Sequence, residues 1–235
     1  MIDTIAFDGD DTLWHNESIF DMTQGRFRQL LLPYVPAEEV DRLLLETERR
    51  NLRLFGYGIK GFILSMIETA VEVTGQRVSA RDIQTILDFG KAMLEHPVEL
   101  IDGVVEALDR LSPGYRLLLI TKGDLFDQES KIARSGLAER FERIEIVSEK
   151  DPETYRRILV RHGVPAERFV MVGNSVRSDI LPVLEIGGHA VHIPYHITWG
   201  HEQVEEPGDG FRTLESAAGL PGLLEQLQVS ASISR

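Results

Sequence analysis

The sequence contains no cysteine, which excludes disulfide bonds and thiol catalysis. Positive charge is also scarce, because 25 lysines and arginines face 38 aspartates and glutamates and leave a formal net charge of -13. Such a balance argues against non-specific binding to nucleic acids or anionic membranes, although local cations can still hold an anionic substrate. We therefore expect neither nucleic acid nor a membrane among the partners.

Long apolar runs are absent as well, since no uninterrupted stretch reaches membrane-spanning length. The chain enters a strand pattern at once, without the basic segment and cleavage site of a secretion signal. The expectation is a soluble, cytoplasmic protein. With 235 residues, 43% hydrophobic and 27% charged, it is long enough to bury a sizeable core.

The most informative segment is residues 1–14, MIDTIAFDGDDTLW. Residues 2–7 have the length and β-branched content of a short buried strand, which ends in DGDDT at residues 8–12. Three carboxylates within four residues repel one another, so a fold that gathers them at a strand tip needs a compensating charge. A bound Mg²⁺ ion would supply it, because hard cations prefer carboxylate and carbonyl oxygens. A solvated acidic turn is the alternative interpretation.

Residues 15–96 show a different pattern. Apolar side chains recur at helical spacing in four segments, and no strand pattern is evident. Breaks that contain proline or glycine separate the segments at residues 33–36, 56–58 and 75–79. We therefore predict an all-helical domain at 15–96, inserted into a core domain made of residues 1–14 and 97–235.

Strand and helix patterns alternate from residue 97 onward. Buried-strand patterns cover residues 115–120, 142–147, 169–172 and 189–193, with helical patterns between them. This alternation is typical of a parallel sheet with helices on both faces. The predicted fold class is α/β, a Rossmann-like parallel sheet with the inserted all-helical domain.

Chemically useful side chains follow four of the predicted strands. Within a few positions of the strands' carboxyl ends stand Asp8, Asp10, Thr121, Lys150, Asn174 and Asp179. Because those ends share one edge of an open parallel sheet, we expect these side chains to meet in one crevice. Carboxylates for a divalent cation, an ammonium and a hydroxyl for phosphate oxygens, and a candidate nucleophile suit the handling of a phosphoryl group.

The same residues give the chain a resemblance to a known family, the haloacid dehalogenase-like hydrolases. Residues 8–12 match its first motif, DxDx[TV], and Thr121 after an apolar strand matches the second. Lys150 before a helix matches the third, and GNSVRSD at residues 173–179 matches the fourth, usually GDxxxD. The chain specifically resembles the phosphatase branch of this superfamily, and its helical insert resembles the C1 cap.

This resemblance implies a Mg²⁺-dependent phosphatase that hydrolyses a small-molecule phosphate monoester through an aspartyl-phosphate. Asp8 would be the nucleophile, and Asp10 would serve as general acid and then general base. The implied catalytic set is Asp8, Asp10, Thr121 and Lys150, the phosphate-binding set is Gly9, Thr121, Lys122 and Lys150, and the metal-binding set is Asp8, Asp10, Asn174 and Asp179.

Two positions depart from the family pattern. Asn174 stands where the fourth motif usually has aspartate, and Asp151 follows Lys150 where many members have proline. An amide oxygen at position 174 can still reach a metal or a bound water, but one negative charge is lost. We therefore expect somewhat weaker metal binding, and the division of ligation between Asn174 and Asp179 stays open.

Other functions remain possible on the same fold. A haloacid dehalogenase uses an aspartate nucleophile but needs no Mg²⁺ and lacks the second carboxylate of the DxD motif. A non-catalytic phosphate-binding protein would typically have lost Asp8 or Asp10, and both are present.

Three further assignments concern individual residues. Lys131, on the helix that follows Thr121, competes with Lys150 for the role of the site's cation. Tyr57 and Lys60 adjoin a break in the helical domain, and residues at such loops often contact ligands. They are therefore the candidate specificity residues.

Overall fold

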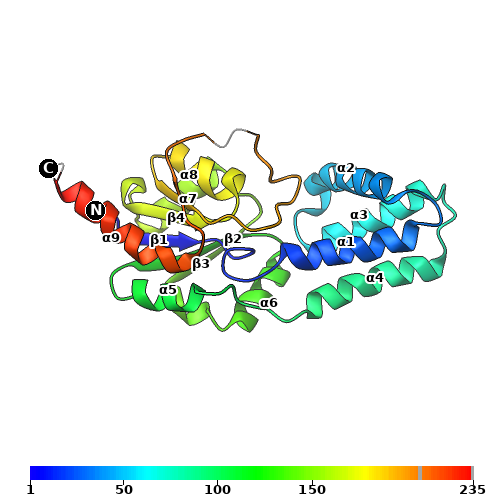
Figure 1. The fold of residues 1–235 in the computed structure, drawn as a ribbon, viewed down its shortest axis with the longest axis horizontal. Coiled ribbons are helices and arrows are strands. Elements are labelled where there is room, and N and C mark those ends of the chain that lie inside the picture. The colour runs from blue at the N-terminus through cyan, green and yellow to red at the C-terminus, as the bar shows by residue number, and fades with distance from the viewer. Residues whose placement is uncertain (206–207, 234–235) are drawn as a thin grey trace. The chain divides into compact units, whose positions relative to one another are not determined.

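The computed structural model describes residues 1–205 and 208–233, and Figure 1 shows its helices and strands. The chain divides into two compact units. One, here the sheet unit, contains Met1–His15, Val98–Lys122 and the described chain from Lys131 onward. The other, here the helical unit, contains Asn16–Pro97 and Gly123–Ser130.

In the described part of the chain, the sheet unit is built on a six-stranded sheet of order β3-β2-β1-β4-β5-β6. Every neighbouring pair of strands is parallel. The strands are β1 (Thr4–Phe7), β2 (Arg116–Lys122), β3 (Arg143–Val147), β4 (Phe169–Gly173), β5 (His189–His192) and β6 (Arg212–Thr213). The predicted α/β fold class with a Rossmann-like parallel sheet is confirmed.

Helices cover both faces of this sheet (Figure 1). Side chains of α5 (Val104–Leu111) and α9 (Leu220–Ile233) pack against one face. Side chains of α7 (Pro152–His162) and α8 (Leu181–Glu185) pack against the other. Successive side chains of a strand point to opposite faces, so the continuous apolar run of β1 is buried on both sides.

The register aligns the carboxyl ends of the three central strands. Phe7, the last residue of β1, pairs with Leu119 of β2 and with Val172 of β4. The polar residues that follow these partners, Asp8 after β1 and Thr121 near the end of β2, therefore leave the sheet at the same edge. The fold thus brings to one edge residues that lie far apart in the sequence.

The helical unit contains the predicted helices, α1 (Glu17–Leu31), α2 (Ala37–Phe55), α3 (Ile59–Val73) and α4 (Ala80–Glu95). Ser79 caps α4, because its side chain accepts a hydrogen bond from the Asp82 N–H. The helices enclose a core of their own that includes Phe27, Leu44 and Met66. Within residues 1–205 and 208–233, no helix combines the length and the apolar character needed to cross a membrane.

The segment Gly123–Ser130 groups with these helices, although the sequence pattern placed it in the core domain. Lys60 Nζ lies 2.9 Å from Asp124 Oδ1 and 5.3 Å from the centroid of the Phe126 ring. These contacts join the segment to the start of α3. The helix α6 (Leu125–Ser135) consequently begins in the helical unit and ends in the sheet unit.

Candidate active site

The chain turns back sharply after β1. Asp11 adopts a left-handed conformation with φ of 62°, and its N–H donates to the Trp14 carbonyl at 2.8 Å. A Cβ atom on Gly9 would lie 2.7 Å from Trp14 Cζ2 and 3.1 Å from Thr121 Oγ1. A side chain at Gly9 therefore does not fit without displacing a neighbour, and the turn lies directly against the end of β2.

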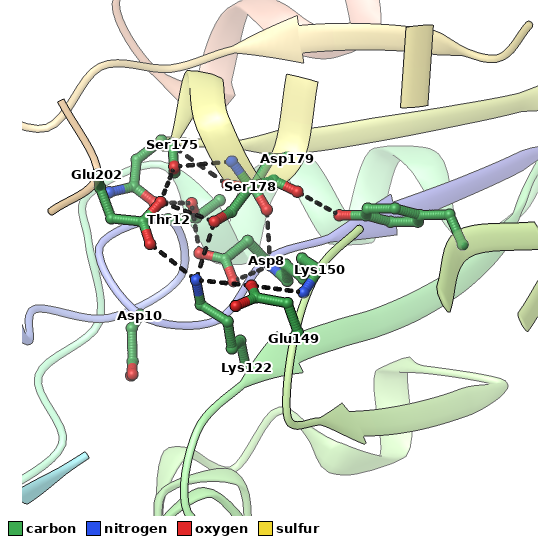
Figure 2. Close-up of polar contacts among 12 residues, drawn as sticks. Asp8, Asp10, Thr12, Lys122, Glu149, Lys150, Ser175, Ser178, Asp179 and Glu202 are labelled. Carbon is green, nitrogen blue, oxygen red and sulfur yellow. Dashed lines mark hydrogen bonds and ion pairs between the residues drawn. The ribbon is translucent and has the colours of Figure 1, made fainter. Parts of the chain in front are cut away.

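Asp8, Lys150 and Asp179 form a buried cluster at this edge of the sheet (Figure 2). Lys150 Nζ lies 2.5 Å from Asp8 Oδ1 and 2.6 Å from Asp179 Oδ1. The three side chains are 2%, 9% and 1% exposed for Lys150, Asp8 and Asp179 respectively. One ammonium thus bridges two carboxylates, and the cluster retains an excess of negative charge.

Burial raises the pKa of Asp8 from 3.8 to about 7. The Lys150 ammonium opposes this change, while the negative charges of Asp179 and Asp10 add to it. Burial alone would lower the pKa of Lys150, but Asp179 and Asp8 outweigh that effect and raise it. Lys150 is thus a permanent cation, whereas the surroundings of Asp8 favour a further positive charge beside it.

The loop after β4 approaches Asp8 from the neighbouring strand. Thr12 Oγ1 lies 3.3 Å from Asp8 Oδ2 and 3.4 Å from Asn174 Oδ1, so this hydroxyl links the first and fourth motifs. Thr121 is fully buried at the end of β2, beside Gly9. Asn174 thus lies beside the Asp8 carboxylate through Thr12, and Thr121 lies beside Gly9, which follows Asp8.

Asp10 is held apart from this cluster. Its Oδ1 accepts from Trp14 Nε1 at 2.7 Å, and Lys131 Nζ lies 3.1 Å and 3.2 Å from its two carboxylate oxygens. Figure 2 shows the Asp10 side chain directed away from Asp8 and Lys150. The two candidate lysines thus have different partners, Lys150 at Asp8 and Lys131 at Asp10.

A carboxylate that the sequence reasoning missed lies beside the site. Glu202 Oε1 accepts from Lys122 Nζ at 2.7 Å, and Glu202 Oε2 accepts from the hydroxyls of Ser175 and Ser178. Glu202 belongs to the irregular chain after β5, where no local pattern marks it. Its contact with Lys122 spans 80 positions of the chain, so the folded structure was needed to find it.

Comparison with known proteins identifies the family. Residues 2–187 match the family model described as haloacid dehalogenase-like hydrolase. The chain belongs to the haloacid dehalogenase-like hydrolase family. A solved structure of a family hydrolase from Xanthomonas campestris is 47% identical, with a TM-score of 0.89 over 100% of this chain and 95% of that one.

More distant relatives are named for different activities. A glyceraldehyde 3-phosphate phosphatase from Methanothermobacter thermautotrophicus is 30% identical over 50% of this chain and 54% of its own length. The chain spans about half the length of the curated relatives that it matches. An L-2-haloacid dehalogenase from Xanthobacter autotrophicus has a TM-score of 0.66, over 96% of this chain and 99% of that one, but only 14% identity, which shows the fold alone.

The oxygen donors around Asp8 suit magnesium better than a metal ion whose ligands all come from protein side chains. In the described ranges 1–205 and 208–233, no group of three or more histidines, aspartates or glutamates is placed to hold a metal ion. Mg²⁺ usually keeps several waters and needs only one or two carboxylates together with substrate oxygens. Asp8 and Asp179 supply two such carboxylates on either side of Lys150, and the raised pKa of Asp8 is the effect that a cation would reverse.

Tyr57 and Lys60 lie in the helical unit, at the start of α3. Gly58, between them, has φ of 102°, and a Cβ atom there would lie 3.3 Å from Asp124 Cβ. This segment therefore packs against Asp124, which follows Lys122 by two positions in the sequence. Whether Tyr57 and Lys60 select the substrate stays a prediction.

Proposed function

We propose that this family member is a Mg²⁺-dependent phosphatase that hydrolyses small-molecule phosphate monoesters through an aspartyl-phosphate on Asp8. The observation that carries the proposal is the buried contact of Asp8 with Lys150, whose ammonium also contacts Asp179. A carboxylate held at a strand end beside a permanent cation is suited to attack an anionic phosphoryl group, because the cation offsets charge repulsion.

In the first step, a carboxylate oxygen of Asp8 attacks phosphorus and forms a new P–O bond. The bond from phosphorus to the ester oxygen breaks, and Asp10 in its protonated form donates a proton to that oxygen. The Lys150 ammonium would offset the charge on the non-bridging oxygens, and the Thr121 hydroxyl would donate a hydrogen bond to one of them. For a loose transition state of this kind, positioning and electrostatic stabilisation supply most of the rate enhancement.

In the second step, water hydrolyses the aspartyl-phosphate. Asp10, now a carboxylate, accepts a proton from the water as its oxygen bonds to phosphorus, and the bond to Asp8 breaks to release phosphate. Asp10 must exchange its contacts with Trp14 and Lys131 for contacts with the reacting oxygens. Asp10 therefore has to move during the reaction.

Asp8 and Asp179 would hold the magnesium ion, together with carbonyl oxygens of Asp10 or Asn174. The bound ion would neutralise charge on the phosphoryl oxygens and favour the ionised form of Asp8. Asn174 contributes a neutral oxygen where a carboxylate would contribute charge, so the chain's own negative charge at the site is reduced by one.

The presence of Asp10 favours a phosphatase over a haloacid dehalogenase. A halide ion leaves without a proton, whereas an alkoxide leaving group needs an acid, and Asp10 stands two positions after the nucleophile to supply it. Retention of both Asp8 and Asp10 likewise argues against a non-catalytic binding protein.

The helical unit would act as a cap that selects the substrate, with Tyr57 and Lys60 as the first candidates. The name of the Methanothermobacter thermautotrophicus relative makes triose phosphates the first esters to test. A cytoplasmic location stays a prediction from the sequence.

A screen of phosphate esters with Mg²⁺, chelator and Ca²⁺ tests the function. We expect hydrolysis that requires Mg²⁺, stops in excess chelator and does not return with Ca²⁺, whose larger and more flexible coordination shell suits this geometry poorly. A parallel assay on 2-chloropropionate should give no chloride. Full phosphatase activity in chelator, or halide release, would contradict the proposal.

A further inference from the structure

Glu202 belongs to the part of the sheet unit that follows β5. Its side chain is largely buried, with 13% of its surface exposed to solvent. Its Oε1 lies 2.7 Å from Lys122 Nζ, and its Oε2 accepts from Ser175 Oγ at 2.5 Å and from Ser178 Oγ at 2.7 Å (Figure 2). This largely buried carboxylate accepts hydrogen bonds from three donors on two other segments, and this pairing stabilises it because an unpaired charge would be costly there.

Two of these donors, Ser175 and Ser178, belong to the loop that holds Asp179, and Lys122 is the last residue of β2. The Ser175 N–H donates to Asp179 Oδ2 at 3.0 Å, and the Ser178 N–H donates to Ser175 Oγ at 3.1 Å. The Tyr155 hydroxyl donates to the Ser178 carbonyl at 3.0 Å. Glu202 therefore holds the same two serines that fix the carboxylate of Asp179 beside Lys150.

The charge of Glu202 is retained at neutral pH. Burial alone would raise the pKa of Glu202, but Lys122 and the hydroxyls of Ser175 and Ser178 outweigh it and lower the pKa to about 2. The ionised carboxylate of Glu202 thus contacts the loop 174–179, in which Asn174 is neutral. Glu202 at 2.7 Å, together with the more exposed Glu149 at 3.3 Å, also offsets the positive charge of Lys122, which opposes a cation near Asp8.

We propose that Glu202 is a positioning residue that supplies, from outside the fourth motif, the negative charge that Asn174 does not. It holds the loop 174–179 in place and offsets the charge of Lys122, so that Asp8 and Asp179 bind Mg²⁺ tightly. The inference rests on the proposed function, because it concerns the metal that the function requires. Glu202 would thus affect the binding of Mg²⁺ although it lies outside all four motifs.

The test is the binding of Mg²⁺ to the full chain, measured by isothermal titration calorimetry without substrate. Glu202→Gln keeps the shape and an acceptor for the serine hydroxyls but removes the charge. We expect it to weaken Mg²⁺ binding about 10–100-fold, the usual effect of changing a residue that orients metal ligands. Glu205→Gln, at an exposed position of the same chain segment, should leave the affinity unchanged.

The decisive variant is Asn174→Asp combined with Glu202→Gln. The new carboxylate restores charge at the loop but no hydrogen bond to Ser175 or Ser178, so recovery of Mg²⁺ affinity separates a charge effect from loss of structure. Equal Mg²⁺ affinity of Glu202→Gln and the wild type would overturn the inference alone. No rescue by Asn174→Asp would do the same.

Two further outcomes complete the test. If Glu202→Gln does not fold by circular dichroism, Lys122→Met makes the opposite change in charge with Glu202 in place. The inference expects tighter Mg²⁺ binding by that variant, and unchanged or weaker binding overturns it. Absence of Mg²⁺ binding by the wild-type chain would contradict the proposed function itself, and the inference with it.

Discussion

Lys150 Nζ lies 2.5 Å from Asp8 Oδ1, and both side chains are almost fully withdrawn from solvent. The same nitrogen contacts Asp179, so a single cation compensates two buried carboxylates. Removal of the cation would leave both acids buried without a counter-charge. The stability of the sheet unit and the proposed chemistry of its site therefore depend on the same ammonium group.

Lys150→Met should lower the free energy of unfolding by about 3–5 kcal/mol, because breaking a buried ion pair leaves an uncompensated charge. Urea denaturation in the presence of chelator measures the change. Lys91→Met is the control, since Lys91 is 64% exposed and pairs with Asp88 at the surface; its effect should stay within about 0.5 kcal/mol. Similar small effects from both variants would contradict the description of the cluster.

Asp8→Asn should change how stability depends on pH in the metal-free protein. The pKa of Asp8 is raised from 3.8 to about 7, so the folded chain binds a proton that the unfolded chain releases between these values. Stability of the wild type should therefore fall as pH rises from about 4 to about 7, and Asp8→Asn should lack this loss.

The measurement is the urea midpoint of both proteins in chelator at about pH 5 and about pH 8. We expect Asp8→Asn to exceed the wild type by more at the higher pH. Asp209→Asn, at an exposed position, controls for the change in net charge. A pH dependence that is the same in the wild type and in Asp8→Asn would refute the raised pKa.

Gly9→Ala should destabilise the protein by about 1–3 kcal/mol, the usual cost of forcing an extra group into a packed site. The added methyl would meet the Trp14 ring and the Thr121 hydroxyl. Gly114→Ala is the matched control, because nothing lies within 4 Å of the Cβ position there. Thermal melts of the two variants measure the difference, and equal melting temperatures would show that the turn has room.

Lys60→Ala should reduce kcat/KM for the preferred phosphate ester more than for para-nitrophenyl phosphate, if the helical unit selects the substrate. Tyr57→Ala should act in the same direction. Asp124→Ala removes the ion pair but leaves the charge of Lys60 in place. It therefore distinguishes substrate recognition by Lys60 from a purely structural role of the ion pair. Equal losses on both esters would mean that this segment only stabilises the fold.

The strands were predictable because β1, β2 and β4 contain continuous buried apolar runs that lead directly into polar residues. The meeting of Asp8 and Lys150 followed from the rule that parallel strands share a carboxyl edge. β6 was missed because a strand of two exposed residues has no periodicity to detect. α9 was not predicted; its Pro221 falls in the first turn of the helix, where proline is well tolerated.

The contacts that the sequence did not predict join distant parts of the chain. Glu202 approaches Lys122 over 80 positions, and Lys60 pairs with Asp124 over 64, so neither contact leaves a local signature. The sequence pattern also left Lys131 and Lys150 as competitors. The structure gives them different partners because the helix α6 directs Lys131 toward Asp10.

The central claim, a covalent phosphate on Asp8, is tested most directly by mass spectrometry of acid-quenched protein. Asp10→Asn is the informative variant, because para-nitrophenolate leaves without a proton while hydrolysis of the aspartyl-phosphate should slow by about 10²–10⁴-fold. We predict that, with Mg²⁺ and para-nitrophenyl phosphate, Asp10→Asn accumulates one phosphate on the peptide that carries Asp8, and that Asp8→Asn carries none. Turnover by the wild type with no such adduct in Asp10→Asn, or an adduct that persists in Asp8→Asn, would contradict the account.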